Sequence, residues 1–452
     1  MAAQTKIVIR LFPLKQGLRR SHSVTLYGLS STFTYGEKVL VSFLGTGKLE
    51  KNSSARQYVK TLYRFEDGRE YSSAFIAQAL KDYYQVDKVI LIGTVHSMWE
   101  EVYSSFVSDE QRDEDYYVKL GEYCAATTPK SELSIPDIGK LESAIGAGSH
   151  VVLTHYGINA EENEKNQQII LGLEELLDKG DELYVDITHA FRSLPLLLLN
   201  SLIYIQTVSQ KRITIRHVCY GMFNSEMPYA PVISLDSLME TTSWIIGAYA
   251  FQEYGNAYKI ADLLDKKDSS TGARLRRFSD LMNLNHLYGI KHQSDLSSLR
   301  NKADYSSKTA EMLIAPIVRE FSREFNPDQK TYLFQFKLAV WHRDHHNYSS
   351  AFIVLQESII SYICYLANWD EDKIEARENA KLALYGKNSI LKQLPPSLVE
   401  KSKALRPCYG LINRTRNSIA HSLNTGKGPD QMIKALNNSI DQFKAVMEGS
   451  NS

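Results

Sequence analysis

The sequence predicts an α/β domain with a parallel sheet followed by an all-α region, and two observations support this fold class. Between residues 38 and 235, short runs of apolar and β-branched residues alternate with stretches of helical periodicity. Beyond residue 236 the strand-like runs stop, and long amphipathic stretches follow one another. Alternation of strands and helices is typical of a parallel sheet that has helices on both faces.

The expected strands are near-continuous apolar runs, as in strands that are buried on both faces. They cover residues 38–44, 88–93, 150–156, 182–188 and 213–221. Helical stretches lie between them, at 73–84 and 166–180. Ligands of such sheets bind beyond the carboxyl ends of the strands. The loops that directly follow the runs are therefore the places where we expect a site.

The helical half is expected to contain long amphipathic helices. They cover residues 238–264, 308–325, 331–343, 348–369 and 430–448. We place the boundary near residues 234–237, which gives a first domain over 38–235 and a second over 236–452. Residues 1–37 contain five basic side chains and no acid before Glu37. They lack a clear apolar segment and cleavage site, so we interpret them as an extension of unknown role rather than a targeting signal.

Composition excludes several classes of protein. Lysine plus arginine and aspartate plus glutamate both total 52 in this chain of 452 residues, which argues against a non-specific, highly basic nucleic-acid coat. The four cysteines are scattered without a CxxC pair, which argues against a zinc site or disulfide framework and fits the cytoplasm. The longest apolar run, near 194–205, is too short to span a bilayer, so no membrane association is expected.

The loops after the first two expected strands carry glycines and hydroxyls. The first reads GTGK, and the backbone N–H groups of Gly45, Thr46 and Gly47 can approach a phosphate or a polar ring. It matches neither a GxGxxG nor a GxxxxGK[ST] fingerprint, so a tight turn without a ligand is the alternative. The second loop offers Thr94 and Ser97.

The loop DITHAFRSLP, residues 186–195, is richer in hydrogen-bond donors. It carries hydroxyl, imidazole and guanidinium groups from Thr188, His189, Arg192 and Ser193. Because an apolar helix follows, this cluster fits an anionic or nucleotide-like ligand near a helix N-terminus. The alternative is that Asp186 and Thr188 cap the helix while Arg192 pairs with an acid. No metal triad and no Ser/His/Asp arrangement can be recognised in these loops.

The segment RTRNSIAH, residues 414–421, contains the groups that metal-free RNA cleavage needs. Histidine can act as the acid or base near neutral pH, and arginine can stabilise the charge that develops on the phosphate. On a helix, Arg414, Asn417 and His421 share one face, whereas Arg416 and His421 are about 140° apart. That pair can converge in an irregular helix or in a composite site between two copies of the chain. The alternative is a solvated helix face.

Taken together, these motifs resemble the CRISPR-associated CARF–HEPN ribonucleases of type III systems, over about residues 38–447. SFLGTG (42–47), the GT at 93–94, YGIN (156–159) and DITHAFRSLP look like CARF strand-end motifs, and RNSIAH (416–421) matches the HEPN R–x₄–H motif. The helix around Tyr348–Glu357 is similar to a HEPN helix that carries an acid near the active site. Ala190 stands where CARF motifs often have glycine.

The resemblance implies a Rossmann-like CARF domain followed by a helical HEPN domain. It also implies a homodimer, or a higher oligomer, that binds cyclic oligoadenylate across its two-fold axis and then cleaves single-stranded RNA without a metal, in antiviral defence. No cofactor other than this activator is implied. The implied activator contacts are Gly45, Thr46, Gly47, Thr94, Ser97, Thr188, His189, Arg192 and Ser193.

The implied catalytic residues are Arg416 for charge stabilisation and His421 for acid–base chemistry, with Asn417 orienting His421 and Arg414 contacting RNA phosphate. An inactive CARF sensor that regulates a partner or a nucleic acid is the second hypothesis. A dinucleotide-dependent enzyme that uses GTGK is the third. The ring size of the activator and the RNA base preference stay open.

Overall fold

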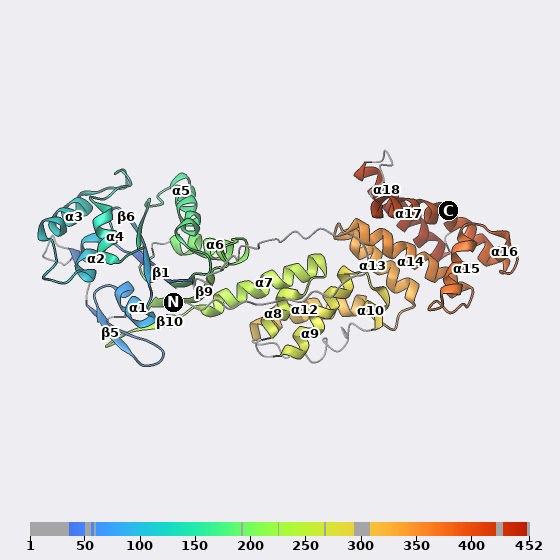
Figure 1. Cartoon of the computed structure of the whole chain (residues 1–452), viewed down its shortest axis with the longest axis horizontal. Helices are drawn as coiled ribbons and strands as arrows, with labels where there is room; N and C mark the ends of the chain where they lie inside the picture. Colours follow the sequence, from blue (N-terminus) through green and yellow to red (C-terminus); the bar gives the residue numbers. More distant parts are fainter. Residues whose placement is uncertain are drawn as a thin grey trace, which may run out of the picture. The chain divides into compact units, whose positions relative to one another are not determined.

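A computed structural model describes residues 36–49, 56–57, 60–190, 193–224, 226–265, 268–292, 308–421 and 428–449. The chain divides into two compact units, whose elements are labelled in Figure 1. The first contains the residues up to 59 together with Ala74–Val185 and His189–Ile215. The second contains Lys60–Ser73, Asp186–Thr188 and the residues from Arg216 onward.

The first unit is built on the predicted apolar strands. They are β1 (Lys38–Leu44), β6 (Lys88–Thr94), β7 (His150–Thr154) and β8 (Glu182–Asp186), in the order β8-β1-β6-β7. Strands β1 and β6 are parallel, as are β6 and β7. Six of the seven residues of β1, and six of the seven of β6, are buried, as their apolar sequences predict. A two-stranded antiparallel ribbon, β2 (Lys48–Leu49) and β3 (Arg56–Gln57), follows β1.

Helices connect the strands of the first unit. They are α1 (Ile76–Tyr84), α2 (Trp99–Phe106), α3 (Glu114–Ala126), α4 (Ile138–Ile145), α5 (Ala160–Leu171), the 3₁₀ helix η1 (Gly172–Leu176) and α6 (Leu194–Thr207). The predicted stretch 166–180 therefore begins inside α5 and continues through η1. Helix α3 begins after Asp113, whose carboxylate accepts a hydrogen bond from the Tyr116 amide, as an N-cap residue does.

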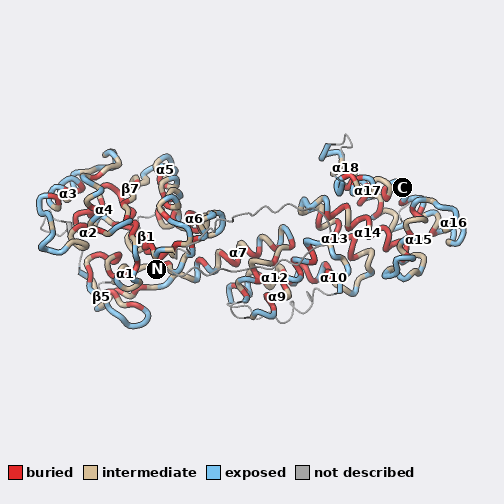
Figure 2. The backbone as a smooth tube through the Cα atoms, in the orientation of Figure 1, coloured by how far each residue is buried: buried red, intermediate tan, exposed pale blue. Residues whose placement is uncertain are grey.

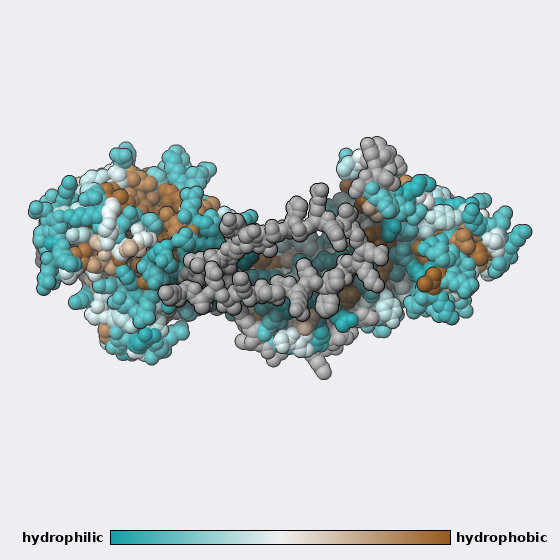
Figure 3. All heavy atoms as spheres, viewed as in Figure 1, coloured by the Kyte–Doolittle hydropathy of each residue, from teal (hydrophilic) through white to brown (hydrophobic). Residues whose placement is uncertain are grey.

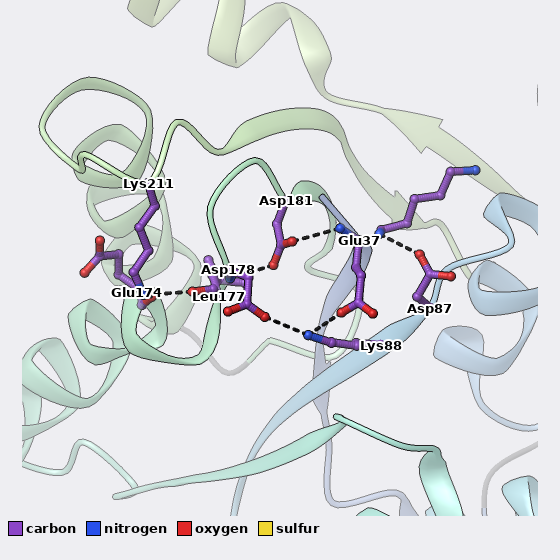
Figure 4. A network of polar contacts seen from close by, with 9 residues as sticks. Glu37, Asp87, Lys88, Glu174, Leu177, Asp178, Asp181 and Lys211 are labelled. Carbon is purple, nitrogen blue, oxygen red and sulfur yellow. Dashed lines mark hydrogen bonds and ion pairs between the residues drawn. The ribbon is translucent and has the colours of Figure 1, made fainter. Parts of the chain in front are cut away.

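Charged side chains hold the strands together at the edge where they begin (Figure 4). The Lys88 ammonium group pairs with the carboxylates of Glu37 and Asp178. The buried Asp181 carboxylate accepts the amides of Glu37 (2.9 Å) and Asp178 (2.8 Å). Because the Glu182 amide also donates to the Glu37 carbonyl (2.9 Å), β8 and β1 begin at the same edge and run in the same direction.

The second unit adds antiparallel strand pairs that the sequence did not predict. Its strands are β4 (Thr61–Arg64), β5 (Glu70–Ser73), β9 (Thr214–Gly221) and β10 (Ala230–Ser234). Pairs β4–β5 and β9–β10 are antiparallel, whereas β10–β4 is parallel. The strands of the protein are therefore mixed in direction rather than all parallel. The segments 65–69 and 222–229 are too short for the crossover that parallel neighbours need.

The rest of the second unit is helical, as predicted, but the stretch 238–264 forms two helices rather than one, because the first of them ends at Gly255. Its helices are α7 (Asp236–Tyr254), α8 (Tyr258–Leu264), α9 (Ser269–Asn283), α10 (Leu287–His292), α12 (Lys308–Glu324), α13 (Thr331–Asp344), α14 (Tyr348–Leu366), α15 (Ile374–Leu384), α16 (Asn388–Leu391), α17 (Pro396–Ala420) and α18 (Pro429–Glu448). Helix α14 lies at their centre and contacts α13, α15, α17 and α18. The fold class is thus α/β followed by all-α, as the sequence predicts.

Helix α14 is also long and apolar enough to cross a membrane, by length and composition alone. However, 72% of its most apolar window is buried inside the protein, and Figure 2 shows it in the colour of buried residues along most of its length. A core helix has the same composition as a membrane span. Its burial therefore favours the role of a core helix.

Candidate functional site

The loops that follow β1 and β6 pack against each other. The Met98 amide donates a hydrogen bond to the Gly45 carbonyl (3.1 Å). Gly47 has a φ of +68°, and a Cβ atom at this position would overlap the Met98 sulfur. Both the backbone conformation and the close approach therefore require glycine here. Thr46, between the two glycines, is exposed.

Thr94 and Ser97 join the ends of these two strands. The Ser97 hydroxyl accepts a hydrogen bond from the Thr94 amide (3.0 Å) and donates one to the Leu44 carbonyl (2.9 Å). Thr94 is 7% exposed and Ser97 only 1%. The Ser97 hydroxyl thus holds the end of β1 in place, and the Thr94 hydroxyl lies 3.3 Å from that hydroxyl. Direct contact between these two side chains and a ligand stays a prediction.

The loop after β7 is held by two asparagines of α5 that we did not single out from the sequence. Asn166, fully buried, accepts a hydrogen bond from the His155 amide (2.8 Å) and donates one to the His155 carbonyl (3.0 Å). The Asn163 amide group donates to the carbonyls of Gly157 (3.2 Å) and Asn159 (2.9 Å). A sequence signal exists, because both asparagines follow a strand-end loop within the first two turns of a helix.

At the end of β8, Asp186 and Thr188 form a turn in the second unit. Asp186 is fully buried and accepts hydrogen bonds from the amide (3.0 Å) and the hydroxyl of Thr188. The Thr188 hydroxyl in turn accepts the Gly221 amide of β9 (2.7 Å). Burial and then the negative charge of Asp186 raise the pKa of Tyr63 to about 12. The hypothesis that Asp186 and Thr188 cap the following helix is wrong, because the N-cap of α6 is Ser193.

The other residues of this loop belong to the first unit. The Ser193 hydroxyl donates to the side-chain oxygen of Asn163 (3.0 Å). Because Asn163 also holds the loop after β7, this bond links that loop to the start of α6. The His189 ring stacks on Phe75 with ring centres 6.4 Å apart. Arg192 lies outside the described residues, so its contact with phosphate stays a prediction.

The predicted catalytic motif lies at the end of α17. The helix continues without interruption to Ala420, and His421 is its C-cap residue. Arg414, Arg416 and His421 are exposed, whereas Asn417 is half-buried. The Arg416 guanidinium group donates to the Asn417 side-chain carbonyl (3.1 Å), so the Asn417 amide contacts Arg416. The contact of Asn417 with His421 is through its backbone carbonyl, which accepts the His421 amide (3.0 Å).

Helix α17 is anchored one turn before the motif. The Gln356 amide group of α14 donates to Asn413 (3.1 Å), and Asn413 donates to the Tyr385 hydroxyl (2.9 Å). The next residue of α14, Glu357, forms an ion pair with Arg377 of α15. Glu357 is thus the acid of the helix that we compared with a HEPN helix, and its carboxylate is paired with arginine.

Nitrogen donors and hydroxyls are the main chemical groups of both regions. Over the described part of the chain, no three His, Cys, Asp or Glu side chains are grouped so that they could hold a metal ion. The four cysteines are free thiols, and each of them is buried. Burial also raises the pKa of the Cys364 thiol to about 11, so this thiol is not an activated nucleophile.

Comparison with known proteins gives matches over most of the chain. Residues 39–226 match the family model of the CARF domain of the CRISPR system endoribonuclease Csx1. Residues 240–329 match a second family model, that of the second domain of CRISPR-associated protein MJ1674. CRISPR-associated protein MJ1674 of Methanocaldococcus jannaschii is 31% identical over 416 residues, which are 87% of this chain. The chain spans 63% of the length of that relative.

A solved structure, Enterococcus italicus Csm6 bound to cyclic hexa-2'-fluoro-hexa-dAMP, is similar over 92% of this chain and 94% of that one, with 12% identity and a TM-score of 0.34. The CARF match starts in β1 and includes all four strand-end loops described above. The match to the MJ1674 second domain starts in α7 and ends before α13. Residues 39–226 are therefore similar to the CARF domain of Csx1, and most of the chain is similar to CRISPR-associated protein MJ1674.

Proposed function

We propose that this protein is an endoribonuclease that cyclic oligoadenylate activates and that cleaves single-stranded RNA without a metal, in type III CRISPR defence. The main observation is that a chain with a Csx1-type CARF domain presents Arg416 and His421, exposed, at the end of an anchored helix. Exposure matters because both side chains must reach an RNA phosphate. Their types are those that the reaction requires.

In the proposed reaction, the ribose 2′-hydroxyl attacks the adjacent phosphorus atom and loses its proton to a base. The 5′-oxygen of the next nucleotide leaves and takes up a proton from an acid. His421 serves in this proton transfer, and Arg416 stabilises the charge that gathers on the phosphate oxygens. The products are a 2′,3′-cyclic phosphate end and a free 5′-hydroxyl end. Arg414, exposed one turn before Asn417, contacts a neighbouring RNA phosphate.

Two copies of the chain are proposed to form the cleavage site. Arg416 and His421 are five residues apart on an uninterrupted helix, and such residues point about 140° apart. A two-fold axis beside the end of α17 brings the arginine of one copy toward the histidine of the other. The composite arrangement therefore needs no distortion of the helix.

The activator is proposed to lie at the carboxyl edge of the strands in the first unit. Thr46 is exposed there between two glycines, while Ser193 and His189 belong to the neighbouring loop. A ring of repeated nucleotides suits a two-fold symmetric pair of such edges. Exposed apolar side chains, Ile158 at 65% and Leu196 at 66%, flank the loops and fit a dimer contact. Figure 3 shows apolar surface on this unit.

An RNA cleavage assay with cyclic tri-, tetra- and hexa-adenylate, with and without EDTA, tests this function. We expect cleavage that depends on one ring size, survives EDTA, and is lost in Arg416→Ala and His421→Ala proteins. Lys403→Ala, which removes an exposed charge from the same helix, is the matched control and should stay active. Cleavage that persists in the His421→Ala protein contradicts the catalytic assignment. A protein that binds a ring but cleaves no RNA is a sensor instead.

A further inference from the structure

The second unit contains a cavity of about 440 Å³ that no role described so far explains. Side chains from α10, α13, α14 and α15, and from the segment that connects α14 to α15, line it. They include Tyr288, His292, Phe334, Gln335, Glu371 and Asp372. Cavities of this volume hold small organic groups in many proteins.

Carboxylates outnumber lysine and arginine side chains in the wall of this cavity, by three to two. Arg377 is paired with Glu357, and the Lys291 ammonium group donates a hydrogen bond to the Thr331 hydroxyl (2.9 Å). Gln335 is 95% buried, since its exposed fraction is 5%, and its Oε1 has no hydrogen-bond partner among the described residues. A buried acceptor without a donor is unfavourable, so this oxygen points to a ligand that donates a hydrogen bond.

Two carboxylates and three aromatic rings narrow the class of ligand. Glu371 and Asp372 add negative acceptors beside Gln335, which disfavours a free phosphate. The Tyr288 and His292 rings lie one helical turn apart, with ring centres separated by 4.8 Å, and Phe334 is 1% exposed. Aromatic walls favour a flat ring, and the acceptors favour amino groups on its edge.

Helix α14 connects the cavity to the end of α17. Glu357 lines the cavity, and the residue before it, Gln356, bonds to Asn413 (3.1 Å). Asn413 lies one helical turn before Asn417. A group held in the cavity is therefore bound to the same rigid helix that anchors the proposed catalytic segment.

We propose that this cavity binds an unpaired RNA base that carries an exocyclic amino group, and that it rejects uracil. An amino group donates to Gln335 and to the carboxylates, whereas uracil has at the same position a carbonyl oxygen, which these acceptors repel, and keeps only its N3–H as a donor on that edge. The proposal rests on the proposed function in one respect, that RNA is the ligand. It deepens that function by assigning a base-selecting site to the helical unit.

Binding of two labelled RNAs to the full-length His421→Ala protein tests the proposal by fluorescence anisotropy. Oligocytidylate and oligouridylate of equal length are the probes, because cytosine has an amino group where uracil has an oxygen. Oligoadenylate is avoided because it resembles the activator. We expect oligocytidylate to bind about tenfold more tightly, since each buried group left unpaired costs about one factor of ten.

Two variants assign the preference to the cavity, and a third controls for it. Gln335→Leu and Asp372→Asn should each reduce the preference for oligocytidylate severalfold, whereas Glu375→Gln, an exposed carboxylate on α15 outside the cavity wall, should not. If Gln335→Leu does not fold, as circular dichroism shows, the exposed Asp372 carries the test. Equal affinity for the two RNAs, or a preference that persists in both variants, overturns the proposal.

Cleavage by the unsubstituted protein separates this proposal from the proposed function. Activated cleavage of both RNAs at equal rates, with equal binding, leaves the ribonuclease and removes the base-selecting cavity. If the protein binds oligocytidylate selectively but cleaves neither RNA with any activator ring, the base-selecting cavity is supported and the ribonuclease function is refuted.

Discussion

The strand-end loops of the first unit and the end of α17 in the second unit use polar side chains in opposite ways. In the strand-end loops, the hydroxyls of Ser97 and Ser193 are bonded to neighbouring loops, so the exposed surface is left to the backbone around Thr46. At the end of α17, Arg416 and His421 remain exposed. The loops of the proposed activator edge are thus held in place by contacts within one chain, whereas the side chains of the proposed cleavage site are exposed and are proposed to meet those of a second copy.

The largest expected effect comes from removing either of the two side chains that form the proposed composite site. Arg416→Ala and His421→Ala should each lower the activated cleavage rate by about 10²- to 10⁴-fold, the range for lost acid–base or charge stabilisation. Ring binding, measured by calorimetry, should not change in either.

Mixing the two inactive proteins sharpens this prediction. In a composite site, mixed dimers pair one intact arginine with one intact histidine, so part of the activity should return. Mixtures that remain inactive, although the subunits exchange, contradict the composite site and favour a complete site within one chain.

The next effect concerns the rigidity of the strand-end loops. Gly47→Ala places a side chain at a φ of +68° and against the Met98 sulfur, and should cost about 2–4 kcal/mol of stability and weaken ring binding. Gly68→Ala is the matched control, because Gly68 has a φ of +86° but no atom within 4 Å of a Cβ. Thermal unfolding of the two proteins separates backbone strain from the clash. Equal destabilisation shows that Met98 moves aside without cost.

A smaller effect distinguishes a positioning role of Ser97 from direct ligand contact. Ser97→Ala removes two buried hydrogen bonds and should lower the stability by about 1–3 kcal/mol, with a parallel loss of ring affinity. Thr46→Ala, at the exposed tip, should weaken ring binding without a loss of stability. If Ser97→Ala leaves the unfolding temperature unchanged and still abolishes binding, its hydroxyl contacts the ligand directly.

The smallest effect is expected at the opposite edge of the same strands. Lys88→Met should reduce stability by less than about 1 kcal/mol, because water screens its partners, and should leave ring binding unchanged. Lys88 lowers the pKa of Asp178 from its usual 3.8. This contribution is therefore complete above pH 3.8 and is lost as the pH falls through the lowered pKa. The acid unfolding curves of the unsubstituted protein and of Lys88→Met should therefore converge below that lowered pKa. A difference in stability that stays constant at low pH contradicts this.

The sequence predicted the buried strands well because their signal is local. The run 38–44 coincides with β1, whose residues after Lys38 are all buried. The hairpin β4–β5 was missed because its short strands contain polar residues such as Thr61 and Glu70, which form no apolar run. Helix α17 was not expected as one helix of 25 residues, because Pro396 and Pro407 interrupt a mostly polar stretch.

At the candidate site, too, local sequence patterns could not predict the contacts between distant segments. Ser97 and Thr188 were singled out by their residue types, but their bonds to Leu44 and Gly221 depend on strands that are distant in sequence. Asn166 was not singled out for the same reason, because its bonds to His155 exist only once α5 packs beside β7. Local patterns therefore indicate candidate residues, whereas tertiary contacts decide which of their side chains remain exposed.

The network at the starting edge of the strands also has a consequence for synthesis of the chain. The Glu37 amide, just before β1, donates its hydrogen bond to the carboxylate of Asp181, which lies 144 residues later. At about 5–20 residues per second, the ribosome needs about 7–30 s to make that partner. During this time the apolar run KVLVSFL has no β8 to pair with. The nascent chain is therefore most prone to aggregate before residue 181 emerges, and a chaperone that binds extended apolar segments should act at this stage.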